Sequence, residues 1–252
     1  MQIILSMNNL RTYKPPTNLL AGRVIMVTGA TKGIGRSISN SLISHGATVV
    51  IHGRNTDALN AFSDEYKDLD LKPNVVTLDL ENTNEKDYQK LSERLLSEYG
   101  RLDGLLHNAS ILGSRKPIEN YSSDEWHKVI QVNLNSAFML TQSLLPLLHN
   151  SSDASMVFTT SGVGNRGRAN WGAYCVSKFG IEGLAQTLAD ELKDTNIRVN
   201  YLDPGATRTD MRHAAYPDED PESLPTPESL LGSYLYLLGP KSKGMNSIRV
   251  IA

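Results

Sequence analysis

Short apolar runs alternate with longer segments of helical periodicity along this chain, and the alternation limits its folds more than any other feature. Such runs suit buried parallel strands, which are covered on both faces and need no polar alternation. Strands that alternate with helices predict a parallel sheet between two helical layers. We therefore expect an α/β protein with a doubly wound Rossmann fold and a mostly parallel sheet of six or seven strands.

The expected elements follow one another closely. The strands are expected at residues 24–28, 48–51, 75–78, 104–107, 156–160 and 197–202, with a short last strand at 247–251. The helices are expected at residues 34–44, 56–66, 84–99, 124–148 and 171–192.

The 252 residues suit one domain with a single large core. Residues 1–20, which include Pro15 and Pro16, read as an N-terminal arm before a domain at 21–252. Residues 206–227 hold four prolines and several acids, which in a compact domain favours a substrate lid.

Composition narrows the classes of partner. The net charge is -2, from 25 basic and 27 acidic residues without long runs of one sign, so neither nucleic acid nor a membrane surface is expected as a partner. The lone Cys175 excludes an internal disulfide and a cysteine-rich metal site, and no metal is expected. The apolar stretch at 1–6 is too short for a signal peptide, so we expect a cytoplasmic protein with a small-molecule substrate.

Tyr174 and Lys178 lie four residues apart in A-Y-C-V-S-K-F-G, with Ser161 thirteen residues upstream. On a helix this spacing places both side chains on one face, where an ammonium favours the ionised form of a phenol. Ser161 follows an expected strand and can bring a hydroxyl beside that phenol. The three residues predict acid–base chemistry by tyrosine.

A glycine-rich segment, T-G-A-T-K-G-I-G, joins the first expected strand of the domain to the first helix. Gly29, Gly33 and Gly35 permit a tight turn and a close approach of backbone to a pyrophosphate at the helix N-terminus. Their spacing differs from the dinucleotide-binding fingerprint G-x-G-x-x-G, so that fingerprint does not match. The mechanism of pyrophosphate binding is still expected to apply. A purely structural glycine turn is the alternative.

The second expected strand is followed by H-G-R-N, where NAD-binding Rossmann sites carry an acid. Gly53 and Arg54 stand there instead, and Lys32 in the glycine loop adds a second cation. These cations favour the 2′-phosphate of NADP(H) over NAD(H). The alternative is that Arg54 is a solvated surface charge.

These motifs, taken in order, resemble the short-chain dehydrogenase/reductase family, in its compact single-domain branch, from about residue 22 to 238. Within that family the segments H-N-A-S-I-L-G and G-R-A-N-W-G-A-Y-C-V-S-K-F are similar to the bacterial YciK-type oxidoreductases. The matched residues are Thr28 to Gly35, Asp79, Leu80, Asn108, Ala109, Asn133, Ser161, Tyr174, Lys178 and Pro204 to Thr209.

The resemblance implies catalytic roles for four residues. Tyr174 is expected to be the general acid or base, and Lys178 to lower its pKa and hold the nicotinamide ribose. Ser161 is expected to donate a hydrogen bond to the carbonyl oxygen. Asn133 is expected to kink its helix and hold a water that links Lys178 to solvent.

The resemblance also implies the cofactor site. It assigns Asp79 to the adenine, Asn108 and Ala109 to the adenine ribose, and Thr207 and Thr209 to the carboxamide and phosphates. A turn or cap role is the alternative for Asp79, Asn108 and Thr209. The expected contacts are Gly29, Thr31, Lys32, Gly33, Ile34, Gly35, Gly53, Arg54, Asp79, Leu80, Asn108, Ala109, Ser110, Tyr174, Lys178, Pro204, Gly205, Thr207 and Thr209, with Ser110 in place of the family's usual glycine.

The expected activity is that of an NADP(H)-dependent carbonyl reductase or alcohol dehydrogenase. A nucleotide-sugar epimerase or dehydratase and a non-catalytic NADP-binding redox sensor are the alternatives. Because the helices at 124–148 and 171–192 are apolar over more than one face, we expect a homodimer or homotetramer. The physiological substrate and the reaction direction do not follow from the sequence.

Overall fold

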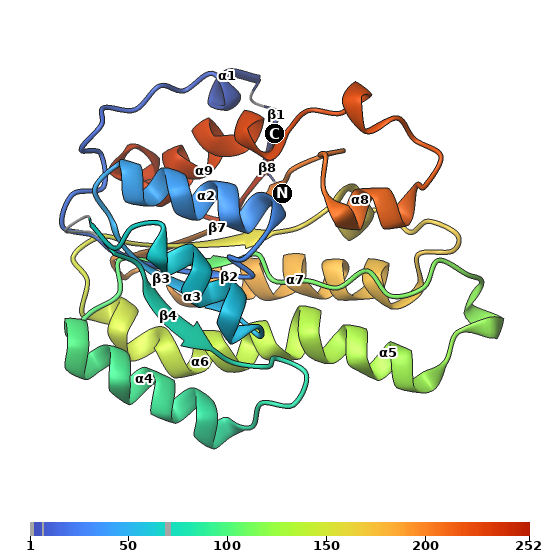
Figure 1. Ribbon diagram of the computed structural model, residues 1–252, viewed down its shortest axis with the longest axis horizontal. Coiled ribbons are helices and arrows are strands. Elements are labelled where there is room, and N and C mark those ends of the chain that lie inside the picture. The colour runs from blue at the N-terminus through green and yellow to red at the C-terminus, as the bar shows by residue number, and fades with distance from the viewer. Residues whose placement is uncertain (1–2, 7, 69–71) are drawn as a thin grey trace.

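The structure is a computed structural model that describes residues 3–6, 8–68 and 72–252. Its parallel sheet has the strand order β1-β8-β7-β6-β5-β2-β3-β4 (Figure 1). The strands are β1 (Ile3–Ser6), β2 (Val24–Thr28), β3 (Thr48–Gly53), β4 (Asn74–Thr77), β5 (Gly104–His107), β6 (Ala154–Thr159), β7 (Ile197–Asp203) and β8 (Ile248–Ile251). The α-helices are α1 (Asn8–Arg11), α2 (Gly33–Ser44), α3 (Thr56–Asp64), α4 (Glu85–Tyr99), α5 (Ser123–Ile130), α6 (Ser136–His149), α7 (Gly172–Glu191), α8 (Asp210–Ala215) and α9 (Leu231–Leu238).

Successive residues of a buried strand feed two different cores, because side chains alternate between the faces of a sheet. In β2, Val24 and Met26 join a cluster with residues of α4, α6 and α7. Ile25 and Val27 join a second cluster with residues of α2, α3 and α9. Figure 1 shows these two helical layers on opposite sides of the sheet. The doubly wound Rossmann fold is confirmed.

The N-terminal residues extend the sheet beyond the six or seven strands that were expected. Of these residues, Ile3–Ser6 form β1, which pairs in parallel with β8 through Ile4 and Arg249, among others. Leu10 and Leu20 are buried against the α9 face of the sheet. A four-residue edge strand held by backbone pairing carries little periodic signal, so its pairing was not expected from the sequence.

The helix expected at 124–148 is interrupted in its middle. Between α5 and α6 the chain forms a π-helical turn at Gln131–Asn135. Turns of this kind insert a residue into a helix and often occur at functional sites. Asn133 lies at the centre of this turn, where a kink was expected.

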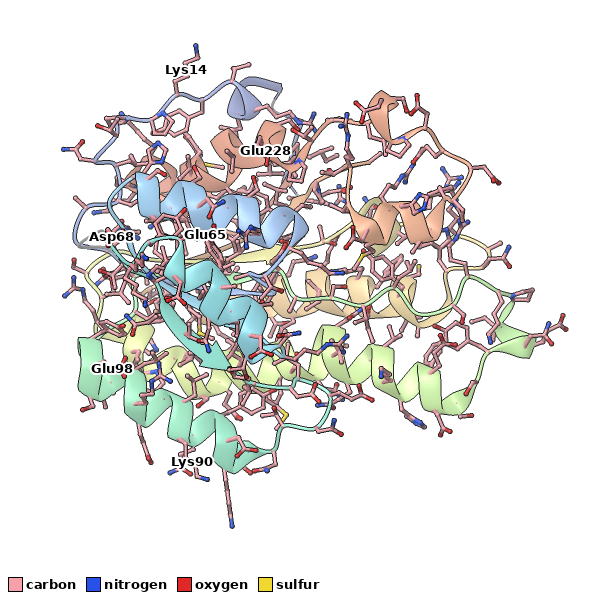
Figure 2. All side chains as sticks on the ribbon, viewed as in Figure 1. Lys14, Glu65, Asp68, Lys90, Glu98 and Glu228 are labelled. Carbon is pink, nitrogen blue, oxygen red and sulfur yellow. The ribbon has the colours of Figure 1, made fainter. Side chains whose placement is uncertain are left out.

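Charged side chains lie mostly at the periphery of the molecule. Lys14, Lys90 and Glu98 are exposed and point away from the sheet (Figure 2). Within residues 3–6, 8–68 and 72–252, no helix is both long and apolar enough to cross a membrane.

Candidate functional site

The main cavity lies at the carboxyl edge of the sheet, where the strand order reverses between β2 and β5. Ligands of open α/β sheets bind at such a switch point, because the loops there diverge and leave a crevice. The cavity has a volume of about 560 Å³, which suits a small molecule or a cofactor. Its walls come from the ends of several strands and from the segment 204–215.

The glycine loop closes one end of this cavity. Gly29 and Gly33 adopt φ angles of 67° and 55°, which disfavour other residues. A Cβ on Gly35 would lie 2.2 Å from the carbonyl oxygen of Gly29, so the unusual spacing of the three glycines is sterically required. At the start of α2, the N-cap Lys32 makes no side-chain cap hydrogen bond with any described residue. The first N–H groups of α2 thus offer a suitable site for a pyrophosphate.

Thr28 and Asn108 hold the glycine loop against the end of β5. The Thr28 hydroxyl accepts hydrogen bonds from the backbone N–H groups of Asn108 at 2.9 Å and Ala109 at 3.0 Å. The Asn108 side chain donates to the carbonyl oxygens of Thr28 at 3.2 Å and Gly29 at 3.4 Å. Asn108 therefore fixes the loop, which accords with its alternative structural interpretation, while it also lines the cavity.

Two cations were expected near the adenosine end of the site. Arg54 follows β3, is exposed and lines the cavity, and it forms no hydrogen bond or ion pair within the described part of the chain. The Lys32 ammonium instead lies 2.9 Å from a carboxylate oxygen of Asp210 in α8. Arg54 is thus the less encumbered of the two expected contacts for a 2′-phosphate.

Asp79 and Thr209 have structural roles in addition to lining the cavity. The Asp79 carboxylate accepts hydrogen bonds from the Glu81 backbone at 3.2 Å and the Asn82 amide at 2.7 Å, which makes it a turn former. The Thr209 hydroxyl accepts from the backbone of Arg212 at 3.2 Å and caps α8. Both residues thus make the local contacts of their alternative interpretations, while their contacts with a cofactor stay predictions.

Ser161, Tyr174 and Lys178 converge at the other end of the cavity. Tyr174 and Lys178 lie one turn apart on α7, and the Lys178 nitrogen is 5.5 Å from the centre of the Tyr174 ring. Ser161 follows β6, and its side chain hydrogen-bonds to the Tyr174 phenol. The sequence spacing therefore predicted a real cluster.

Burial dominates the electrostatics of this cluster. It raises the pKa of Tyr174 to about 12, while the Ser161 hydrogen bond opposes this change and the Asp203 carboxylate adds to it. Burial also lowers the pKa of Lys178 to about 8, against the opposing attraction of Asp203. At neutral pH the phenol is protonated, so it can donate a proton to a bound oxygen.

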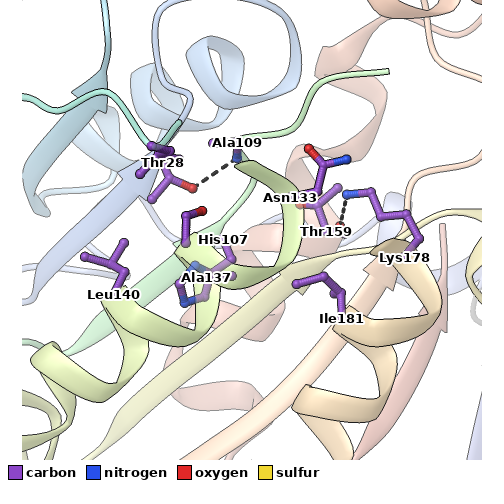
Figure 3. A pocket seen from close by; sticks show the side chains of 11 residues that line it. Thr28, His107, Ala109, Asn133, Ala137, Leu140, Thr159, Lys178 and Ile181 are labelled. Carbon is purple, nitrogen blue, oxygen red and sulfur yellow. Dashed lines mark hydrogen bonds between the residues drawn. The ribbon is translucent and has the colours of Figure 1, made fainter. Parts of the chain in front are cut away.

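Asn133 lies beside a second, much smaller cavity. Its side chain accepts from the backbone of Ile111 at 2.8 Å and donates to the Ile111 carbonyl oxygen at 2.9 Å and to Ser177 at 3.0 Å. Figure 3 shows Asn133 with Lys178 and His107 around this space, and Lys178 donates to the Thr159 carbonyl oxygen at 2.9 Å. The volume of about 10 Å³ is close to that needed by one water molecule.

The main cavity thus brings together every predicted site residue except Gly35 and Asn133. The full predicted set that lines it is Gly29, Thr31, Lys32, Gly33, Ile34, Gly53, Arg54, Asp79, Leu80, Asn108, Ala109, Ser110, Ser161, Tyr174, Lys178, Pro204, Gly205, Thr207 and Thr209. Gly35 packs behind the loop, and Asn133 lines the smaller cavity.

The sequence did not identify most of the apolar wall beside Tyr174. Trp171 and Met211 line this wall, and Met211 lies in the segment 206–227 that was expected to be a substrate lid. The wall also contains Ile111, Leu112, Ala214 and Ala215, and the charged Arg212 lines the cavity beside them. Ile111 and Leu112 directly follow the expected contact Ser110, and the other three residues lie in the expected lid at 206–227. Their nearness to these segments was the sequence signal that could have identified them.

Comparisons with known proteins agree with this geometry. The family profile described as short chain dehydrogenase matches residues 23–220. The Escherichia coli K12 protein named uncharacterized oxidoreductase YciK is 46% identical over 232 residues, which are 92% of each chain. A 3-oxoacyl-[acyl-carrier-protein] reductase of Thermotoga maritima is 32% identical over 76% of this chain and 77% of its own.

Solved structures extend the similarity to nearly the whole fold. The solved structure of an oxidoreductase, yciK from E. coli, superposes with a TM-score of 0.92 at 44% identity, over 95% of this chain and 98% of the other. A Shigella flexneri 2a chain solved in complex with NADP has a TM-score of 0.91 at 43% identity, over 94% and 99% of the two chains. An E. coli CFT073 chain solved with NADPH has a TM-score of 0.92 at 44% identity, over 94% and 99%.

Proposed function

The chain belongs to the short chain dehydrogenase family of oxidoreductases, and from this premise we propose that it is an NADP(H)-dependent carbonyl reductase or alcohol dehydrogenase. Its substrate is a small or medium organic carbonyl compound or alcohol. One observation carries the proposal: a single cavity connects the glycine loop and Arg54 with the Tyr174 phenol.

The residues around the cavity fit an NADP(H) molecule. The N-terminus of α2 would hold the pyrophosphate, and the exposed Arg54 would pair with the 2′-phosphate. Asn108 and Ala109 would pack against the adenine ribose, and Lys178 would reach the other ribose. When bound, the dinucleotide supplies or accepts the hydride. The NADP and NADPH complexes of two structural relatives support this choice of cofactor.

Tyr174 carries the proton chemistry in this proposal. Its buried, protonated phenol donates a proton to the carbonyl oxygen of the substrate during reduction. In the reverse direction the phenolate left by that step takes the proton of the alcohol. Ser161 is already hydrogen-bonded to the phenol and would stabilise negative charge on the same oxygen.

Lys178 and Asn133 would replenish the proton. Both line the small cavity, which has room for about one water molecule. A water held there could pass a proton from the Asn133 side toward Lys178. The low pKa of Lys178, about 8, suits an amine that gives up and regains a proton near neutrality.

We also propose that the protein forms a homodimer or homotetramer through α6 and α7. Phe138 on α6 and Val176 and Phe179 on α7 are 49%, 45% and 43% exposed, although they are large and apolar. Burial of such side chains against a second copy removes apolar surface from water. Light scattering should report at least a dimer at micromolar concentration. A monomer would refute the proposal.

The cofactor and the chemistry can be tested in two steps. NADPH and NADH are titrated separately by fluorescence, first with the native chain and then with Arg54→Ala. NADPH should bind the native chain more tightly, and the variant should lose about tenfold or more of that affinity with little change for NADH. A panel of carbonyl compounds then tests turnover. Equal affinities would refute the cofactor preference, and tight NADPH binding without turnover of any compound would favour the redox sensor.

A further inference from the structure

Arg249, in the C-terminal strand β8, has the largest of the fully buried side chains in the described part of the molecule. Its Nε donates to a carboxylate oxygen of Glu182 at 3.0 Å. Its Nη2 donates to a carboxylate oxygen of Asp203 at 3.0 Å and to the backbone carbonyl oxygen of Ser161 at 3.1 Å. One guanidinium thus joins three segments of the chain.

These three segments carry the reacting groups of the site. Glu182 lies on α7, one turn beyond Lys178, and its carboxylate also accepts from the hydroxyl of Thr160 at 2.7 Å. Asp203 ends β7, and its second carboxylate oxygen accepts from the backbone of Gly205 in the loop that lines the cavity. The network therefore links the helix of Tyr174 and Lys178 to the loops after β6 and β7.

The network is buried, so its charge balance matters. Glu182 and Asp203 are 3% and 6% exposed, and Arg249 is the cation that both carboxylates contact. A buried carboxylate without a partner is strongly unfavourable, and its field is poorly screened. Asp203 already acts on the site, since its charge favours higher pKa values for both Tyr174 and Lys178.

We propose that Arg249 is a positioning residue of the active site, which fixes the Ser161 carbonyl and balances the charge of Asp203 behind Tyr174. The proposal rests on the proposed function in taking Ser161 and Tyr174 as the reacting pair. The family profile ends at residue 220, so β8 lies outside it. In this proposal β8 nevertheless supplies a residue on which the site depends.

The surroundings of the phenol make Asp203 the relevant charge. The groups around it are Lys178 on its own helix, Asp203 from β7, the thiol of Cys175, the phenols of Tyr121 and Tyr216, and, beyond the Trp171 and Tyr216 rings, the guanidiniums of Arg115, Arg168 and Arg212. Asp203 supplies the negative charge in this set. Loss of Arg249 would leave that charge less balanced and the Ser161 carbonyl without its guanidinium donor.

Two variants give opposite expectations for the ionisation of Tyr174. Arg249→Met should raise the pH at which the phenol ionises, and Asp203→Asn should lower it, each by an amount that corresponds to about a tenfold change in proton affinity. The readout is ultraviolet tyrosinate absorbance at one alkaline pH at which the chains remain folded by circular dichroism. Subtraction of the same measurement on matched Tyr174→Phe chains isolates this residue. A merely structural role would change thermal stability and leave this absorbance unchanged.

A neutral triple variant keeps the test valid if Arg249→Met does not fold. Glu182→Gln, Asp203→Asn and Arg249→Met together remove all three charges, and neutral replacement of buried ion networks is often tolerated. This variant should bind NADPH like the native chain and turn over at least about tenfold more slowly than it. It should also show less tyrosinate than the Glu182→Gln, Asp203→Asn double variant, which retains the positive charge of Arg249. Arg249→Lys should restore the absorbance but not the turnover, because an ammonium cannot form the same fork.

Unchanged Tyr174 absorbance in the folded variants would overturn the role of Arg249, whatever their turnover. Failure of the native chain to reduce any carbonyl compound would refute the proposed function instead, and the absorbance measurement would still decide the role of Arg249.

Discussion

The Lys32 ammonium of the glycine loop and the Asp210 carboxylate at the start of α8 lie 2.9 Å apart, so an ion pair joins the loop to α8. Their side chains are 74% and 79% exposed, which makes the pair weak and sensitive to salt. Both residues line the main cavity. Lys32 can therefore contact a 2′-phosphate only in competition with Asp210.

Asp210→Asn should increase the affinity for NADPH. Removal of the carboxylate frees Lys32 and takes a negative charge away from an anionic ligand, so Kd should fall about two- to fivefold at low ionic strength and less at high salt. NADH affinity should change less. Fluorescence titration measures both, with Asp190→Asn as the control because Asp190 is an exposed partner of Lys193. Weaker NADPH binding in Asp210→Asn would show that the ion pair helps to form the site.

Tyr174→Phe should abolish turnover while NADPH affinity stays within about twofold. The variant keeps the ring but loses the proton donor, and general acid–base catalysis contributes about 10²–10⁴-fold in rate. Steady-state assays on the best carbonyl compound and cofactor titration measure the two effects. Tyr99→Phe, in α4, is the matched control. Full activity of Tyr174→Phe would rule out the proposed acid.

The sequence anticipated the strand-end residues of the site better than the contacts between distant segments. Tyr174 and Lys178 were predictable because helical spacing alone places them together. The glycine loop was predictable because the backbone angles and close approach that require glycine depend on neighbouring residues in the sequence. The Lys32–Asp210 pair and the Arg249 network join residues far apart in the chain, and no periodicity records such pairings. The sequence contains one indication of the Arg249 network, which is a charged residue within the apolar run S-I-R-V-I. A charge that is buried with such a run needs partners of opposite charge or hydrogen-bond acceptors.

Lys178→Met should stabilise the protein at neutral pH and inactivate it. Burial lowers the pKa of Lys178 from 10.5 to about 8. Between pH 8 and 10.5 the unfolded chain binds more protons than the folded protein, so the free energy of unfolding rises with pH in this range. Below pH 8 the buried amine is protonated, and its burial costs the full amount of about 3 kcal/mol. Loss of the bond to Thr159 would offset about 1 kcal/mol of the gain.

Urea denaturation at several pH values measures this effect. The variant should exceed the native chain by about 2 kcal/mol at pH 7, and the difference should shrink as pH rises above 8. Because both chains contain the same buried tyrosines, the ionisation of those phenols largely cancels from the comparison. A less stable variant at pH 7 would mean that the charged amine contributes favourably to the fold.

Acid sensitivity should depend on two buried histidines beneath the site. Burial lowers the pKa of His52 to about 4 and of His107 to about 3, from an ordinary value of 6.5. Below pH 6.5 the unfolded chain therefore binds more protons than the folded protein. The free energy of unfolding falls as the pH is lowered from 6.5 to the pKa values of the folded state. Each histidine contributes a slope of about 1.4 kcal/mol per pH unit within this window.

His107→Gln should remove one of these two slopes. Glutamine retains a group that can hydrogen-bond to Thr141 but cannot titrate, and it loses the stacking of His107 on Phe158 at 4.6 Å. The variant should therefore be less stable at pH 7, yet its free energy of unfolding should fall more gently than that of the native chain between pH 6 and 5. Urea denaturation across that range measures the two slopes. Parallel curves would show that His107 binds its proton equally well in the folded and the unfolded protein, because its removal then leaves the pH dependence unaltered.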